Sequence, residues 1–163
     1  MEEFLYSATA LKKGIRNKTT QENELNLQML RATILNPARE WLGQPIYVTS
    51  GFRHPNVNKT IAGAGVSKTS QHMKGEAADI TTGDRVANVR LFVFIRDYLA
   101  FDQLISENDL QWIHVSHVSD GSRVNRRQVL EITNGLTTWS GTATTHRRLR
   151  PDWTVFYGKE DGK

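Results

Sequence analysis

Two histidines and one aspartate in this sequence have the types and spacing of ligands to a catalytic metal ion. Within the stretch 70–80, His72 and Asp79 flank a glycine turn, and small apolar residues typical of a buried strand follow. A third candidate, His114, lies at the centre of the alternating segment 112–116. Zinc binds imidazole nitrogen and carboxylate oxygen, and its catalytic sites combine three protein ligands with one open position. The three residues are therefore predicted to form a zinc site.

The segment around His114 is expected to be a strand that presents this histidine to a cleft. Side chains alternate between the two faces of a strand. Trp112, His114 and Ser116 would share one face, while Ile113 and Val115 would point to the other, towards a core.

The composition restricts the kind of metal site and the number of domains. The chain has 163 residues and no cysteine, which excludes a disulfide framework, an iron–sulfur cluster and a thiolate zinc site. Any zinc must be held by histidine and carboxylate. A chain of this length is expected to form a single domain over residues 1–163, because it can bury a sufficient core without disulfides.

Positive charge is concentrated in the last part of the chain. The formal net charge is +4, and residues 119–163 hold eight Lys and Arg against five Asp and Glu. We interpret 119–163 as a basic C-terminal extension packed on the same domain. Its arginines and its aromatic residues Trp139, Trp153 and Tyr157 allow a surface for glycan or nucleic acid. A solvated surface with packed tryptophans is the alternative, and nucleic acid is not the expected partner.

No transmembrane segment or export signal is recognisable. No apolar run approaches the roughly 20 residues needed to cross a bilayer. The first residues carry two glutamates instead of a basic segment and an apolar stretch. The prediction is synthesis in the cytoplasm without a signal peptide, so a target outside the membrane would require a release partner.

The first half of the chain is expected to contain one long helix, one strand and one long loop. Apolar residues recur at three- and four-residue steps over 20–42, which predicts an amphipathic helix that Pro37 bends or divides. Gly43 is the expected stop. A short strand is predicted over 46–49, followed by a long loop over 52–69.

The second half is expected to alternate strands with one helix. Asp84 is the predicted N-cap of a helix over 85–99. The strands are predicted over 77–81, 103–106, 112–116 and 127–133, and turns over 134–145. Strands with helices set to one side indicate an α+β fold.

Three segments in this order resemble the M15 family of zinc D-Ala-D-Ala peptidases, in particular its compact phage and bacterial members. They are Ser50-Gly51-Phe52-Arg53, the stretch 70–79 and the segment 112–116. The resemblance covers roughly residues 4–118. It implies a hedgehog/DD-peptidase-like fold with a small antiparallel sheet and helices packed to one side. It also implies one zinc ion and hydrolysis of an amide bond in peptidoglycan stem peptides, as in a carboxypeptidase or an endolysin.

The resemblance assigns His72, Asp79 and His114 as the zinc ligands. It gives Arg53 the task of holding a substrate carboxylate or polarising the scissile carbonyl, as an arginine can through two parallel hydrogen bonds. Gln71 and Ser70 are candidates for hydrogen bonds to substrate or to the groups that surround the metal ligands, with a simple turn role as the alternative.

The general base departs from the family pattern. Many members carry an acid three residues before the last zinc histidine, where this chain has Gln111. The nearest acids are Glu107 and Asp109, in the turn before that strand. Glu107 is the preferred candidate, because it follows the strand over 103–106 as a glutamate does in similar phage-type sequences.

Two further expectations concern biological setting and a rival function. The missing signal suggests a phage-encoded lysis enzyme released by a holin-type partner, or a cytoplasmic enzyme acting on precursors. The rival is a module of the same fold that binds a wall peptide or a partner without cutting it, which Gln111 favours.

Overall fold

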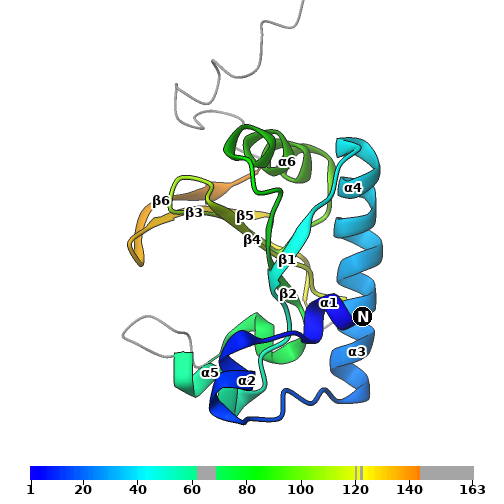
Figure 1. Cartoon of the computed structure of the whole chain (residues 1–163). Helices are drawn as coiled ribbons and strands as arrows, with labels where there is room; N and C mark the ends of the chain where they lie inside the picture. Colours follow the sequence, from blue (N-terminus) through cyan, green and yellow to red (C-terminus); the bar gives the residue numbers. More distant parts are fainter. Residues whose placement is uncertain (62–68, 120, 122, 144–163) are drawn as a thin grey trace, which may run out of the picture.

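The computed structural model describes residues 1–61, 69–119, 121 and 123–143 (Figure 1). Part of the predicted basic and aromatic surface, from residue 144 to 163, lies outside the described residues. Within the described part, no helix combines the length and the apolar character needed to cross a membrane.

The long helix predicted over 20–42 is present as three consecutive helical segments. They are α3 (Gln21–Leu30), a π-helical turn η1 (Arg31–Leu35) and α4 (Asn36–Leu42). Thr20 begins this helix with a capping box to Asn23. The π turn ends two residues before Pro37, whose ring lacks an N–H and would clash with a carbonyl in a regular α-helix. Gly43 ends the helix in the left-handed conformation, with φ of 68°, as predicted.

The remaining helices are short, except for α6. Asp84 caps α6 (Arg85–Tyr98) through a 2.7 Å hydrogen bond from the Ala87 amide, as predicted. The other helices are α1 (Glu2–Leu5), α2 (Ala8–Lys13), α5 (Pro55–Ile61) and the 3-10 helix η2 (Gln71–Lys74). Helix α5 lies in the segment predicted as a loop over 52–69, so that prediction is wrong for this part.

Six strands form one mixed sheet in the order β1-β2-β4-β3-β5-β6. Strands β3 and β5 are parallel and the other neighbours are antiparallel. The expectation of a small antiparallel sheet is therefore wrong in size and in direction, while the α+β class is confirmed. Strand β6 falls within the segment predicted as turns. The strands are β1 (Tyr47–Ser50), β2 (Ala77–Thr81), β3 (Gln103–Glu107), β4 (Trp112–Ser116), β5 (Gln128–Thr133) and β6 (Leu136–Thr142).

The central strands separate a core face from an open face. Ile80 of β2, Val115 of β4 and Leu104 of β3 are fully buried in the core, and α3, η1, α4 and α6 supply its other side. The intervening residues, including Asp79 and His114, point to the opposite face. Because strand side chains alternate between the two faces of the sheet, the apolar ones lie under the helices and the polar ones point towards a cleft.

The turn that ends η2 depends on a glycine for two reasons. Gly75 has φ of 75°, a left-handed conformation that side chains with a Cβ adopt at a cost. A Cβ at this position would also meet the Asn23 carbonyl of α3. The 3-10 turn that carries His72 is therefore packed directly on the backbone of α3.

Gly75→Ala is expected to lower the free energy of unfolding by about 2 kcal/mol or more, through left-handed strain and displacement of η2 from α3. Gly43→Ala is the matched control, because Gly43 has a similar φ of 68° but no atom lies within 4 Å of the position that a Cβ would occupy. This control should lose only about 1 kcal/mol. Urea unfolding of both variants measures the difference, and equal losses would show that close packing at Gly75 is unimportant.

Candidate metal centre

Strand register brings two of the three predicted ligands together. Asp79 of β2 and His114 of β4 are direct cross-strand partners. Such partners have neighbouring side chains on one face of a sheet. The His114 Nδ1 atom lies 2.9 Å from Asp79 Oδ1.

The third candidate ligand, His72, reaches the same point from the turn η2. Its side chain is buried, and Nδ1 lies 2.7 Å from the carbonyl oxygen of Gly51. Because a carbonyl can only accept, Nδ1 carries a proton and the lone pair of Nε2 points to the cluster. Gly51 itself must lack a side chain, since a Cβ there would meet the backbone of Phe4. The Arg53 amide donates to the His72 carbonyl at 3.1 Å and fixes the turn further.

The three candidate ligand atoms form a nearly regular triangle. His72 Nε2 lies 3.2 Å from Asp79 Oδ1 and 3.2 Å from His114 Nδ1, and the third side measures 2.9 Å. A tetrahedral zinc ion with bonds of about 2.0–2.1 Å separates its ligand atoms by about 3.3 Å. Two imidazole nitrogens and one carboxylate oxygen at these separations therefore fit zinc in both chemistry and size.

The electrostatics of the cluster favour ligands that are free of protons. Burial lowers the pKa of His72, and the charge of Asp79 offsets this effect only partly. Burial alone would raise the pKa of Asp79, but His72 and His114 outweigh it and hold this pKa well below its usual range. A neutral imidazole and an ionised carboxylate are the forms that bind a metal ion.

Arg53 lies beside the cluster and is oriented by two groups. Its Nη2 atom donates to Asp79 Oδ2 at 3.1 Å and its Nε atom donates to the Ser50 hydroxyl at 3.2 Å. The single carboxylate of Asp79 thus contacts the two histidines through one oxygen and the arginine through the other.

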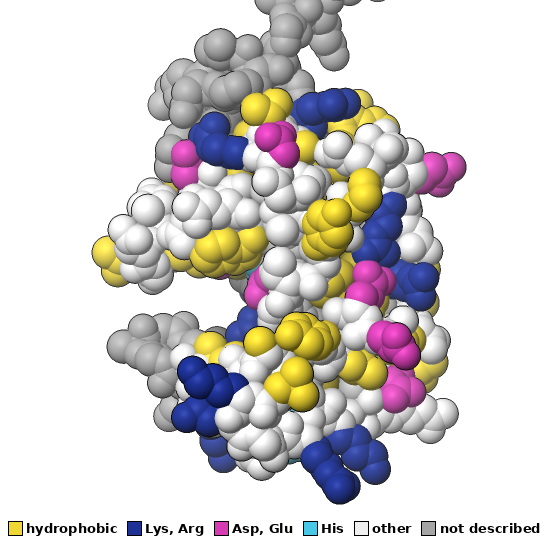
Figure 2. All heavy atoms as spheres, in the orientation of Figure 1, with side chains coloured by type: hydrophobic (Ala, Val, Ile, Leu, Met, Phe, Trp, Pro, Cys, Tyr) yellow, Lys and Arg dark blue, Asp and Glu magenta, His cyan; other side chains and the backbone are white. Residues whose placement is uncertain are grey.

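The cluster lies in a cleft of about 630 Å³. Figure 2 shows the molecule hollowed on the left, between the strands β3 and β6 above and the helices α2 and α5 below. The lining residues include the predicted Arg53, Ser70, Gln71 and Glu107, together with residues that were not predicted as part of the peptidase site: Lys74, Glu76, Gln103, Arg123 and Arg126.

Of the acids considered as general base, only Glu107 lines this cleft. Its carboxylate makes no hydrogen bond to any described residue, and burial followed by the charge of Asp79 raises its pKa. Asp109 instead forms an ion pair with Arg85 at 2.7 Å on the outside of the turn. Gln111 is exposed and is absent from the cleft lining.

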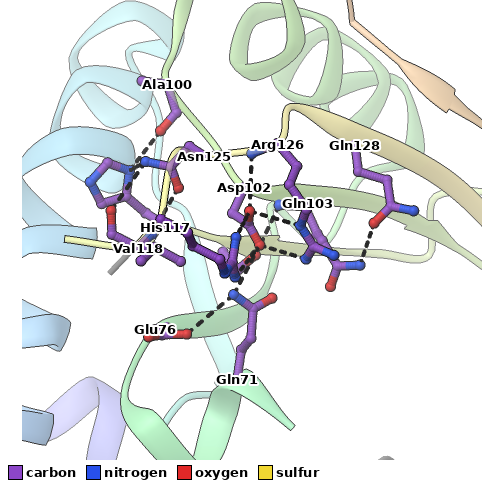
Figure 3. A network of polar contacts seen from close by, with 12 residues as sticks. Gln71, Glu76, Ala100, Asp102, Gln103, His117, Val118, Asn125, Arg126 and Gln128 are labelled. Atoms are coloured by element: carbon purple, nitrogen blue, oxygen red, sulfur yellow. Dashed lines mark hydrogen bonds and ion pairs between the residues drawn. The ribbon is translucent and has the colours of Figure 1, made fainter. Parts of the chain in front are cut away.

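Gln71 belongs to a polar network centred on Asp102, which sequence reasoning did not select as a functional residue (Figure 3). Its Nε2 atom donates to Asp102 Oδ2 at 3.1 Å and to Glu76 Oε2 at 3.3 Å. Asp102 is fully buried and also accepts bonds from Arg123 and Arg126. Burial would raise the pKa of Asp102, but the two arginines hold it well below its usual range.

Three further polar or aromatic side chains outside the metal cluster have structural partners. The His117 Nδ1 atom lies 2.6 Å from the Ala100 carbonyl, away from the metal cluster. Arg127 donates to two carbonyls at the end of α6, those of Arg96 and Leu99. Trp139 is half-buried against the core. The position of Trp139 agrees with the alternative of packed tryptophans, and Arg127 binds carbonyl oxygens of the protein itself.

A comparison with protein families matches residues 1–116 to the family described as Peptidase M15. The chain belongs to the peptidase M15 family. Comparisons with curated proteins and with solved structures gave no match. Membership implies hydrolase activity, and M15 peptidases are zinc-dependent, in keeping with a His72–Asp79–His114 cluster that can hold a metal ion. The matched range contains all three of these residues, Arg53 and Glu107, but ends before Arg123.

The depressed pKa of Asp102 predicts a specific dependence of stability on pH. An unfolded aspartate titrates near pH 3.9, so the stability from ionised Asp102 is complete above about pH 5 and declines as the pH falls through 4 towards the lower folded pKa. Asp102→Asn should reduce the free energy of unfolding by about 3 kcal/mol at pH 6 and by clearly less at pH 3.

Urea unfolding at the two pH values tests this prediction. Asp97→Asn removes an exposed ion pair with Arg96 and serves as the control. It should change stability by less than about 1 kcal/mol at either pH. If Asp102→Asn lowers the free energy of unfolding equally at pH 3 and pH 6, the lowered pKa of Asp102 is contradicted.

Proposed function

We propose that this protein is a zinc metallopeptidase that hydrolyses an amide bond in peptidoglycan stem peptides, in the manner of a D-Ala-D-Ala carboxypeptidase or an endolysin. The observation that carries the proposal is the triangle of ligand atoms in a cleft that Arg53 and Glu107 also line. Membership of the M15 family supports the reaction class. The peptidoglycan substrate rests on the resemblance in the motifs.

His72, Asp79 and His114 would hold the metal ion through Nε2, Oδ1 and Nδ1. When bound, zinc supplies Lewis acidity that activates water and polarises a carbonyl. The chain contributes the rigidity of the site, because Gly51 fixes the ring of His72 and strand pairing fixes the other two ligands.

Glu107 is suited to accept a proton from the attacking water and to return it to the leaving amine. A general base is most effective when its pKa lies nearer the working pH than that of an ordinary carboxyl group. The raised pKa of Glu107 moves it in this direction. Since the base must be ionised, activity should fall as the pH is lowered through this raised pKa, which lies above the roughly 4.3 of an ordinary glutamate.

Arg53 is suited to orient the substrate. Two of its five N–H groups are used by Ser50 and Asp79. The others allow a charge-assisted contact with a substrate carboxylate or with the carbonyl oxygen that gains charge during attack.

Removal of a ligand should abolish zinc binding and cleavage together. His72→Ala and His114→Ala are each expected to weaken zinc binding at least about 100-fold, because a site with two remaining ligands is incomplete. His54→Ala is the control, since the His54 ring accepts a bond from the Asn56 amide at 3.2 Å and is not part of the cluster.

Competition with a chelator measures zinc affinity, and mass spectrometry of defined muropeptides with and without chelator identifies the bond that is cut. Release of product by zinc-free protein, or by His72→Ala, would overturn the proposal.

Glu107→Gln should lower kcat by about 100-fold or more and leave zinc content unchanged, because it removes the base and retains the ligands. Asp109→Asn should change kcat less than about threefold, since Asp109 forms an exposed ion pair outside the cleft. Steady-state kinetics on one muropeptide compare the two variants. A large loss in Asp109→Asn with full activity in Glu107→Gln would move the base to the other acid.

The rival function, a module that binds a wall peptide without cutting it, is favoured by one observation only. Gln111 occupies the position where many family members carry an acid. The rival predicts that wild-type protein binds stem peptides and releases no product at any zinc concentration.

A further inference from the structure

Two arginines from outside the family match, Arg123 and Arg126, line the cleft together with the metal cluster. Both belong to the segment between β4 and β5, and both bind the carboxylate of Asp102. Their side chains remain 39% and 47% exposed, whereas Asp102 is fully buried. Asp102 is therefore a buried anion, and the two arginines in front of it are cations that reach the cleft.

Asp102 receives more donors than a carboxylate needs. Oδ1 accepts bonds from Arg123 Nη1, from the Arg126 amide at 3.0 Å and from Arg126 Nε at 3.0 Å. Oδ2 accepts bonds from Arg123 Nη2 at 2.9 Å, Arg126 Nη2 at 2.6 Å and Gln71 Nε2 at 3.1 Å. These six donors compare with about four lone-pair positions on a carboxylate. One arginine would suffice to neutralise Asp102, so the second adds positive charge to the cleft wall.

The local charge is positive at the end of the cleft that holds the arginines. Lys74, Arg123 and Arg126 carry three positive charges there, while Glu76 in the lining and Asp102 buried behind it carry two negative charges. Asp102 takes only two of the five guanidinium N–H groups of Arg126. This end of the cleft thus offers both the charge and the donors that a carboxylate requires.

The arginines lie at a defined distance from the metal cluster along β3. Ile105 is the cross-strand partner of His114 and lines the cleft beside the cluster. Asp102 precedes it by three residues, or about 10 Å at 3.3 Å per residue. Glu107 lies beyond Ile105 in the opposite direction. An extended peptide in the cleft would therefore place a side chain or terminus about three residues from the cleaved bond against the arginines.

We propose that Arg126 and Arg123 form a carboxylate-binding subsite that selects substrates with an acidic group about three residues from the cleaved bond. This inference rests on the proposed peptidase function and deepens it. Asp102 and Gln71 are positioning residues, since they hold the guanidinium groups and do not contact the substrate themselves.

The test uses the stem pentapeptide L-Ala-γ-D-Glu-diaminopimelate-D-Ala-D-Ala and two analogues, each with one free carboxylate amidated, at the glutamate or at the diaminopimelate. The zinc-loaded wild-type protein should cut one analogue about tenfold less efficiently, mainly through a higher KM, because one charge-assisted contact is lost. Arg126→Gln should lose about tenfold on the free acid and remain unchanged on that analogue.

Three controls separate recognition from folding. Arg90→Gln removes an exposed arginine that stacks on Trp41 outside the cleft and should retain full discrimination. Arg126→Lys keeps the charge without the planar fork and should discriminate to an intermediate extent. Arg123→Gln repeats the test if Arg126→Gln fails to fold, as judged by thermal unfolding.

Equal kcat/KM for the acid and both analogues in wild-type protein would overturn the subsite and leave the peptidase function intact. A loss in Arg126→Gln that is the same for acid and amide would also overturn it. If the wild type cuts none of the peptides, the proposed function fails, and peptide binding measured by fluorescence anisotropy decides the subsite. About tenfold tighter binding of the acid, lost in Arg126→Gln, supports it, and equal binding overturns it.

Discussion

The carboxylate of Asp79 is the contact on which the arrangement of the site depends. Oδ1 is shared by His72 and His114, and Oδ2 receives Arg53. This arrangement exists because the register of β2 and β4 places Asp79 opposite His114. A slip of one residue would turn Asp79 towards the core and bring a neighbouring apolar residue to the cleft. Ala78 and Ile80, the apolar neighbours of Asp79, are buried in the core and therefore fix the position of the candidate metal ligands.

Strand β3 positions the remaining functional side chains of the cleft. It lies between β4, which carries His114, and β5, which begins after the arginine-containing segment. The backbone of Asp102 accepts from the Gln128 amide at 2.9 Å and donates to the Ser116 carbonyl at 2.7 Å, so one residue joins both neighbouring strands. Its buried side chain then orients Arg123 and Arg126. The same strand thus positions Glu107 at one end of the cleft and a cationic wall at the other.

Local patterns in the sequence predicted the parts of the site that depend on nearby residues. The strand period identified the face of His114, Asp84 and Gly43 identified helix ends, and Pro37 indicated the irregularity that the π turn accommodates. Such patterns did not predict contacts between residues that are far apart in the sequence. The parallel pairing of β3 with β5 and the contact of Asp102 with Arg126, 24 residues apart, have no periodic signal. Helix α5 was missed because seven residues rich in polar side chains show no clear apolar period.

The sequence alone gave no physical reason to prefer Glu107 over Asp109 as the general base, and the fold supplies one. Both acids lie near one turn, and only the direction of the chain at the end of β3 places one carboxylate in the cleft and the other against Arg85. The turn contains three successive residues with positive φ, Asn108, Asp109 and Leu110. Asn and Asp adopt this conformation more often than other residues with a Cβ, but Leu does not, so the sequence did not predict a run of three.

Anomalous diffraction at the zinc edge, from crystals of the zinc-loaded protein, tests most directly whether His72, Asp79 and His114 hold one zinc ion. A single strong peak is expected at about 2.0–2.2 Å from His72 Nε2, Asp79 Oδ1 and His114 Nδ1. A peak at any other set of side chains, or no peak at this cluster under saturating zinc, would contradict it.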